Sequence, residues 1–349
     1  MPVTPWRRSD IVRLMSHVFR LPVMGGRVER DSIPESHQAS HPLPRVSTGP
    51  RGEIVAGYLA PHPPHLIYAE NPPQNEPRST GGWEVLRWAY DEVRRRIREV
   101  HKPDVIVVHA PHWITMVGHH VNCVPHVEGR SVEPIFPDLF RYDYAFDTDV
   151  ELANAIADTA SDMGLVTSKM AVPGVRVDYA TIGALHLLNP DWDIPVVSLS
   201  ANNNPYYYSA AGLEEMEVLG AATRQAIEAT GRRAVLAGSN SLSHLHWDTE
   251  PDLPEDMAAE HPWSHAQYAA DMVLLEAVRA GRTGDLRDGL IEDHIAATQS
   301  ETKAGSLSWL LAAMAWPEIP GDVLGYGTII GTGNAVIEWD PNHPAVRHA

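Results

Sequence analysis

From residue 53 onward, the chain alternates short apolar runs with longer segments whose apolar residues recur at helical spacing. The short runs are almost continuously apolar, as expected for strands in a sheet that is covered on both faces. These predicted strands are 54–59, 105–108, 194–199 and 234–237. The predicted amphipathic helices are 86–100, 149–163 and 212–229. The alternation predicts a single α/β domain with a largely parallel central sheet flanked by helices on both faces.

The two ends of the chain depart from this alternation. Residues 262–316 predict a mainly helical segment near the C-terminal third, and residues 326–338 are typical of closing strands. Residues 1–50 are rich in arginine and proline, so we interpret them as an N-terminal extension that could serve as a docking arm. The predicted organisation is an extension at 1–50, one main domain at 51–340 and a tail at 341–349.

Composition narrows the classes of function. The 349 residues include 27 Lys plus Arg and 45 Asp plus Glu, a formal net charge of −18. This charge argues against general binding to nucleic acid or to an anionic membrane surface. No apolar run approaches the roughly 18 residues that span a bilayer. The single cysteine, Cys123, excludes an intramolecular disulfide and a multi-cysteine metal site, and we expect a cytoplasmic protein.

Two of the predicted strands end in the same tripeptide. The first runs into Ala60-Pro61-His62 and the second into Ala110-Pro111-His112. Ligands of open α/β sheets bind beyond the carboxyl ends of the strands, so adjacent parallel strands of this kind would present two imidazoles together. Each proline stops the strand and fixes the backbone before its histidine. The pair predicts metal ligands or an acid–base pair, with capping of strand-end carbonyls as the structural alternative.

Other histidines near these strand ends are weaker candidates. His65 shares a loop with His62 but lies farther from the strand end. His109 lies on the strand itself, which favours a position in the core. His119 and His120 would point to opposite faces of a following strand, so both are not expected to serve one site.

A third histidine-bearing loop, 238–246, follows the strand 234–237. His244 or His246 could transfer protons at the same sheet edge, or could be satisfied loop residues. The loop contains no Gly-x-Ser-x-Gly pattern, so a serine hydrolase is weakly supported. Elsewhere, Gly331-Thr332-Gly333-Asn334 lacks the third glycine and the following helix of a dinucleotide-binding fingerprint.

Two histidines and one carboxylate form the ligand set of non-haem Fe(II) oxygenases. Spacing alone does not identify the carboxylate, for which Glu292, Asp293 and Glu301 are all candidates. Because a His/His/Glu set also suits catalytic zinc, a zinc-dependent hydrolase is an alternative.

Several longer stretches resemble the class III (LigB-type) extradiol ring-cleavage dioxygenases, in particular those that act on aminophenols. The resemblance covers about residues 52–340. It is carried by the segments 59–66, 71–78, 112–115, 176–179, 198–203, 325–328 and 338–340.

The resemblance implies roles for five positions of this sequence. His62, His112 and Glu301 match the ligands of Fe(II), and His244 matches the catalytic acid–base histidine that also contacts the substrate. Tyr179 matches a tyrosine beside the substrate ring, with a packing residue as the alternative. The implied reaction uses O2 to open an ortho-aminophenol or a related catecholic or hydroxypyridine ring, giving a muconic semialdehyde-type product.

The resemblance also implies an oligomer. Enzymes of this family pair two related subunits, and the partner lacks a complete iron site. Because all three ligand positions are filled here, the chain resembles the iron-bearing subunit. A homologous alpha subunit and a second copy of the chain both stay open as the partner, and a non-catalytic partner subunit is the other alternative.

Overall fold

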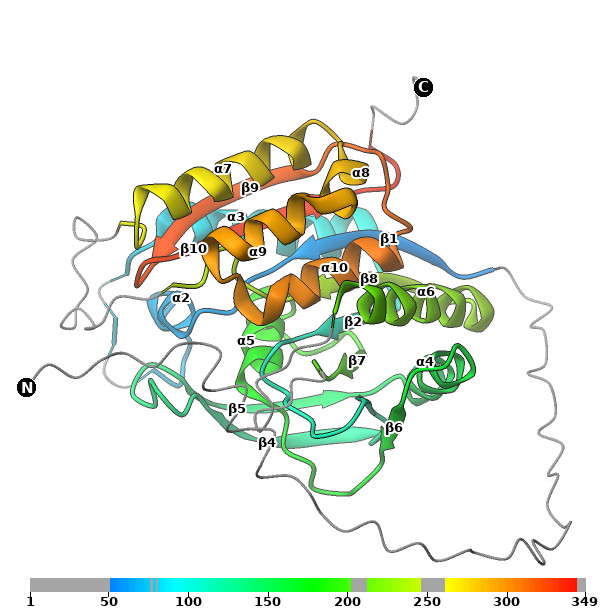
Figure 1. Ribbon diagram of the computed structural model, residues 1–349. Helices are drawn as coiled ribbons and strands as arrows, with labels where there is room; N and C mark the ends of the chain where they lie inside the picture. Colours follow the sequence, from blue (N-terminus) through cyan, green and yellow to red (C-terminus); the bar gives the residue numbers. More distant parts are fainter. Residues whose placement is uncertain (1–50, 76–77, 80, 202–211, 246–260, 344–349) are drawn as a thin grey trace, which may run out of the picture. The chain divides into compact units, whose positions relative to one another are not determined.

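The computed structural model describes residues 51–75, 78–79, 81–201, 212–245 and 261–343, and the fold below is the fold of these residues (Figure 1). They belong to a unit that extends from Val46 to Ala349. The predicted extension at 1–50 and positions 344–349 of the predicted tail lie outside the described residues.

An eight-stranded sheet with the order β6-β3-β7-β2-β8-β1-β10-β9 forms the centre of the fold. Its strands are β1 (Glu53–Leu59), β2 (Val105–His109), β3 (His119–Asn122), β6 (Thr167–Met170), β7 (Val196–Leu199), β8 (Arg233–Gly238), β9 (Asp322–Ile329) and β10 (Thr332–Trp339). The β7-β2-β8-β1 pairs are parallel, as is β3-β6, whereas β3-β7, β1-β10 and β10-β9 are antiparallel. The predicted largely parallel sheet is confirmed, with an antiparallel hairpin added at one edge.

Helices cover both faces of the sheet (Figure 1). One face is covered by α4 (Val150–Asp162), α6 (Leu213–Thr230), α7 (His265–Arg279), α9 (Ile291–Thr298) and α10 (Gly305–Ala313). The other face is covered by α2 (Pro64–Ala69), α3 (Glu84–Arg95) and α5 (Tyr179–Leu188), together with a separate hairpin of β4 (His126–Val132) and β5 (Arg141–Asp147). A π-helix, η1 (Arg96–His101), continues α3 over the end of the helix predicted at 86–100.

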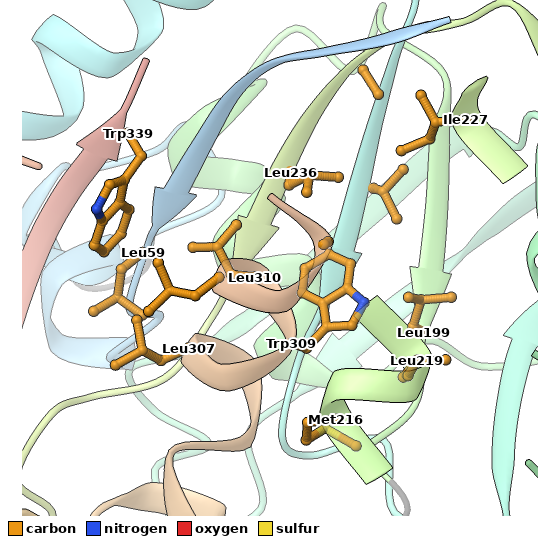
Figure 2. Packing of buried hydrophobic residues seen from close by; sticks show 14 of the residues in the cluster. Leu59, Leu199, Met216, Leu219, Ile227, Leu236, Leu307, Trp309, Leu310 and Trp339 are labelled. Atoms are coloured by element: carbon orange, nitrogen blue, oxygen red, sulfur yellow. The ribbon is translucent and has the colours of Figure 1, made fainter. Parts of the chain in front are cut away.

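Alternate residues of the central strands supply the two cores. Val105 and Val107 of β2 face one core, and Ile106 and Val108 face the other. Figure 2 shows the first core, where α6 and α10 pack on the sheet through fully buried side chains that include Leu219, Leu236, Leu307, Trp309 and Leu310. Burying a leucine side chain of this kind stabilises the folded state by about 1.5–3 kcal/mol, so these contacts hold the central strands in place.

The C-terminal third is mainly helical, as predicted, but a left-handed turn interrupts it. After α7 come the short α8 (Thr283–Asp285), η3 (Leu286–Leu290) and α9, and then the turn η4 (Glu301–Ala304) leads into α10. Thr302, Lys303 and Ala304 have φ values of 46°, 55° and 52°. Residues other than glycine rarely adopt this conformation, and its cost is tolerated mostly at functional positions. Glu301 is the first residue of this turn, which connects α9 to α10.

One expectation about the sheet is wrong. The strands that end in Ala-Pro-His are parallel but not adjacent, because β8 lies between β1 and β2 and pairs with both. Strand order is decided by long-range pairing that local pattern does not encode. The two carboxyl ends still meet at one edge, and the loop after β8 joins them there. Within the described residues, no helix combines the length and apolar character needed to cross a bilayer.

Candidate metal centre and substrate cavity

His62 and His112 meet at the carboxyl edge of the sheet, each two residues beyond the alanine that directly follows its strand. Ala60 is tied to β8 by a hydrogen bond from its N–H to the carbonyl of Gly238, at 2.9 Å. The two imidazole rings lie edge to face with centroids 5.3 Å apart. The structure thus brings together the two imidazoles that the strand-end argument placed at one edge, even though β8 separates β1 from β2.

Glu301 is the one of the three candidate carboxylates that lies beside these two histidines. Its Oε1 lies 3.0 Å from His112 Nε2 and 3.7 Å from His62 Nε2. One ligand atom from each of the three residues lies within 4.8 Å of the others, so together they could hold a metal ion. The other two candidates, Glu292 and Asp293, are exposed on α9.

Ser239 determines which nitrogen of His62 faces this cluster. The Ser239 hydroxyl donates to the carbonyl of Ala60 at 2.6 Å, so its only hydrogen is committed. The 2.8 Å contact with His62 Nδ1 must then be a hydrogen bond from Nδ1–H to the serine oxygen. His62 Nε2 is left with a lone pair directed toward Glu301, which is the form that binds a metal.

The electrostatics of the cluster keep a neutral imidazole beside a charged carboxylate. Burial lowers the pKa of His62 to about 3, although the charge of Glu301 opposes this shift. Burial also acts to raise the pKa of Glu301, but His244, His62 and His112 outweigh it and hold that pKa well below its usual range. For His112, burial is outweighed by the hydrogen bond to Glu301, and the pKa is raised. Both Glu301 and His62 are thus in the forms that ligate metals at neutral pH.

His244 lies beside the cluster but outside the candidate ligand set. Its Nε2 is 4.0 Å from Glu301 Oε1, and its Nδ1 is 2.6 Å from the hydroxyl of Ser241. The backbone N–H of Ser241 also donates to Glu301 Oε2 at 2.9 Å, so one residue positions both side chains. Burial lowers the pKa of His244, which favours the neutral ring that can accept a proton.

Tyr179 stands against His112 at the start of α5. Its hydroxyl is 2.9 Å from His112 Nε2, and the two ring centroids are 4.5 Å apart. Asp178 caps the helix by accepting hydrogen bonds from the N–H of Thr181 at 3.0 Å and from its hydroxyl at 2.6 Å. Burial raises the pKa of Tyr179 far above its ordinary value, so the phenol keeps its proton.

A cavity of about 110 Å³ opens over these side chains. Besides the five predicted residues, it is lined by Pro63, Pro64, His65, Glu133, Ile135, Phe136, Ser241, Ile329, Ile330, Thr332 and Asn334. The walls combine flat aromatic and aliphatic surfaces with a few polar groups, as in sites for small organic ligands.

Sequence reasoning missed three polar residues of this region. Ser239 and Ser241 belong to the loop that carries His244, and their position directly after a strand was the available signal. Glu133 is a buried carboxylate of the cavity wall whose side chain accepts a hydrogen bond from the N–H of Phe136. Burial raises its pKa. It follows β4 of a small separate hairpin, and no local motif marks it.

The remaining histidine candidates lie outside the candidate ligand set. His65 packs edge to face on Trp83 and Phe136 in the cavity wall. His109 is buried against α10, where Nδ1 lies 2.9 Å from the Ser306 hydroxyl and the ring stacks on Trp309.

The paired histidines of β3 also belong to other environments. His119 Nε2 lies 2.9 Å from a carboxylate oxygen of Glu215, and His120 meets Trp113 edge to face. His246 lies outside the described residues.

Comparisons with known proteins agree with this geometry. Residues 56–337 match the family described as the catalytic LigB subunit of aromatic ring-opening dioxygenase. The chain is 56% identical over 290 residues to a 2-aminophenol 1,6-dioxygenase beta subunit from a Pseudomonas species, covering 83% of this chain and 94% of that protein. It is 24% identical to a 3,4-dihydroxyphenylacetate 2,3-dioxygenase of Escherichia coli, covering 78% and 94% of the two chains.

Two further similarities concern a paired subunit and the fold. The chain is 25% identical to the 2-aminophenol 1,6-dioxygenase alpha subunit of a Pseudomonas species, covering 74% of this chain and 91% of that subunit. An uncharacterised protein of Escherichia coli K12 shares the fold with a TM-score of 0.53 and 14% identity, covering 81% of this chain and 99% of that one.

These matches confirm the predicted resemblance and favour a dioxygenase over a hydrolase. The family match spans most of the chain, and the protein that is 56% identical is a homologue along nearly its whole length. The chain belongs to the LigB family of catalytic subunits of aromatic ring-opening dioxygenases and is an extradiol ring-cleavage enzyme.

Proposed function

We propose that this chain uses Fe(II) and O2 to open the ring of an ortho-aminophenol, with His62, His112 and Glu301 as the iron ligands. The observation that carries the proposal is the convergence of these three side chains on the wall of a ring-sized cavity. Two imidazoles and one carboxylate are the donor set that non-haem Fe(II) uses while leaving positions for a substrate and O2. The identity to an aminophenol dioxygenase subunit supports the substrate class.

Fe(II) held there would supply a Lewis acid that binds both neighbouring heteroatoms of the substrate and activates O2. His244 then accepts the proton of the substrate hydroxyl and later returns it, because its neutral ring lies at the edge of the cavity beside Glu301. Tyr179 keeps its phenolic proton and provides a hydrogen-bond donor and a flat surface beside the substrate ring.

The proposed iron site selects substrates that carry two adjacent donor atoms at one edge of the ring. An ortho-aminophenol, a catechol and a hydroxypyridine all present two adjacent donors, so ring substituents and the nature of the donors must decide among them. We expect 2-aminophenol to be the preferred substrate and a muconic semialdehyde-type compound to be the product.

An oxygen electrode tests this proposal with a panel of ortho-substituted aromatics. Anaerobically purified, iron-loaded protein should consume one O2 per 2-aminophenol, and mass spectrometry of the freshly formed product should show that both atoms of labelled O2 are incorporated into it. A panel on which no compound supports O2 uptake, with iron present, would reject the proposed function.

For the quaternary structure, we propose a heteromer with a homologous alpha subunit. The chain is related to both subunits of a Pseudomonas aminophenol dioxygenase, which supports a pairing of similar folds. We propose that residues 1–50 are an extension beside a catalytic domain at 51–340 and a tail at 341–349, and that they serve as a docking arm in this pairing. Native mass spectrometry of the protein isolated from its source cells would reveal two different chains; a homodimer would contradict this proposal.

We further propose that the enzyme acts in the cytoplasm. A buried free thiol, Cys123, and a ferrous cofactor are both compatible with a reducing compartment.

A further inference from the structure

A buried hydrogen-bonded network lies directly behind the His244 loop and outside the lining of the cavity. We call it the Asp271 network, formed by Asp271, His294, Ser243 and Tyr326. Asp271 Oδ1 lies 2.8 Å from His294 Nε2, and Oδ2 accepts hydrogen bonds from the hydroxyls of Ser243 and Tyr326, each at 2.7 Å. Asp271 has no exposed surface, and His294 and Ser243 are almost completely buried.

The chain builds this network from four separate elements. Asp271 comes from α7, His294 from α9, Tyr326 from β9 and Ser243 from the loop after β8. A buried carboxylate is costly unless donors surround it, and here three donors do so. Burial and the charge of Asp271 raise the pKa of Tyr326 far above its ordinary value, so its hydroxyl stays a donor.

Gly333 shows how closely the network is packed. Its N–H donates to the hydroxyl of Ser243 at 3.0 Å and to the carbonyl of Ser243 at 3.1 Å. A Cβ at this position would lie 1.9 Å from Asp271 Oδ2, 2.6 Å from Ser243 Oγ and 2.8 Å from Tyr326 Oη. Only glycine fits here, which gives the Gly331-Thr332-Gly333-Asn334 segment a role other than dinucleotide binding. Its neighbours Thr332 and Asn334 line the cavity instead, as alternation along a strand requires.

The network is connected to both halves of the active site through the backbone. The N–H of His244 donates to the carbonyl of Thr298 on α9 at 3.2 Å. The hydroxyl of Ser300 donates to the carbonyl of Leu242 at 2.6 Å, immediately before Glu301. The loop that carries His244 and the turn that carries Glu301 are therefore fastened to each other and to Asp271.

We propose that Asp271, acting through Ser243, is a positioning residue that fixes His244 relative to Glu301 for proton transfer. The inference rests on the proposed function, since it assigns a role to the support of His244. A proton-transfer group must lie within hydrogen-bond distance of the substrate proton. If its loop can shift, the rate of proton transfer falls, whereas metal and substrate binding are affected less.

Two variants distinguish a role in positioning His244 from a role in stability alone. Each removes one hydrogen-bond donor from Asp271 Oδ2. Ser243→Ala breaks the connection to the His244 loop, and Tyr326→Phe removes the donor that comes from β9. We expect Ser243→Ala to lower kcat about tenfold with KM and iron content little changed, and Tyr326→Phe to keep kcat within about threefold. Equal losses of kcat in the two variants, or an unchanged kcat in Ser243→Ala, would overturn the proposal.

Hydrogen exchange provides a readout that does not depend on turnover. In metal-free protein, amide exchange in the segment 239–244 should accelerate up to about tenfold in Ser243→Ala and much less in Tyr326→Phe. Unchanged exchange in that segment in Ser243→Ala overturns the positioning role even if the proposed reaction is correct. Should the wild type show no O2 uptake, this exchange pattern still tests the support of the loop. If Ser243→Ala does not accumulate as folded protein, Ser243→Cys, whose thiol donates only weakly, replaces it with the same criteria.

Discussion

The single hydrogen of the Ser239 hydroxyl selects the tautomer of His62. Because that hydrogen is donated to the carbonyl of Ala60, the imidazole must donate from Nδ1 and present Nε2 to Glu301. Because this hydrogen bond fixes the ring orientation and the tautomer in advance, metal binding does not require the ring to flip or its proton to move. The geometry of the proposed iron site thus depends on a residue that does not touch the metal.

Replacing Ser239 by alanine should weaken Fe(II) binding about 10- to 100-fold while leaving the fold intact, because His62 loses its acceptor. Anaerobic titration of metal-free protein with Fe(II) measures this loss. Ser198→Ala on β7 is a matched control, since the hydroxyl of Ser198 is buried and has no hydrogen-bond partner among the described residues. Equal Fe(II) affinities in the two variants would show that Ser239 does not orient His62.

Replacing His244 by alanine should leave iron bound but reduce kcat by about 10²–10⁴, the usual contribution of a general acid–base group. The reason is that His244 lies 4.0 Å from Glu301 yet is absent from the group of potential ligands. Iron content and O2 uptake measured on the same sample distinguish the roles. Loss of the metal in this variant would instead make His244 a ligand.

At the scale of elements, the sequence predicted the central parallel strands and the long helices because their periodicity is local, whereas it did not predict the β4–β5 hairpin or α5. The Ala-Pro-His endings of β1 and β2 located His62 and His112 from that pattern alone. Two features were out of reach. The insertion of β8 between these strands depends on long-range pairing. The left-handed turn that presents Glu301 has no local sequence signature, so spacing left three carboxylates open and only the family resemblance singled out this one.

The start of α5 affects both the stability of the helix and the geometry of the site, because the capping residue Asp178 directly precedes Tyr179. Asp178→Ala should lower the free energy of unfolding by about 0.5–2 kcal/mol and should also reduce kcat/KM, since Tyr179 loses its fixed position. Asp149→Ala, which removes the cap of α4 far from the cavity lining, should lower stability without that loss of kcat/KM. Thermal unfolding and steady-state assays compare the two. A normal kcat/KM in Asp178→Ala would separate the cap from the function of Tyr179.

For the molecule as a whole, buried neutral histidines make stability depend on pH. Burial lowers the pKa of His109 to about 3, below its ordinary value near 6.5. The unfolded chain therefore binds a proton that the folded chain excludes. The stability contributed by keeping this ring neutral is complete above about pH 6.5 and is lost as the pH falls toward 3.

His109→Gln should remove this pH dependence, since the substituted side chain does not titrate. Between pH 8 and pH 5, wild-type protein should lose about 2 kcal/mol of unfolding free energy relative to the variant. Urea unfolding of metal-free samples at several pH values measures the difference. A difference between the two proteins that stays constant with pH would show that His109 does not carry the effect.

The most direct test of the account is the iron content of wild-type protein and Glu301→Ala after anaerobic loading with Fe(II). Three ligands, from the loops after β1 and β2 and from the turn before α10, are proposed to bind one ion, so the wild type should bind one Fe(II) per chain. Glu301→Ala should bind little or none at the same concentration and should consume no O2 with 2-aminophenol. A variant that keeps its iron and its turnover would contradict the proposed metal site and the function built on it.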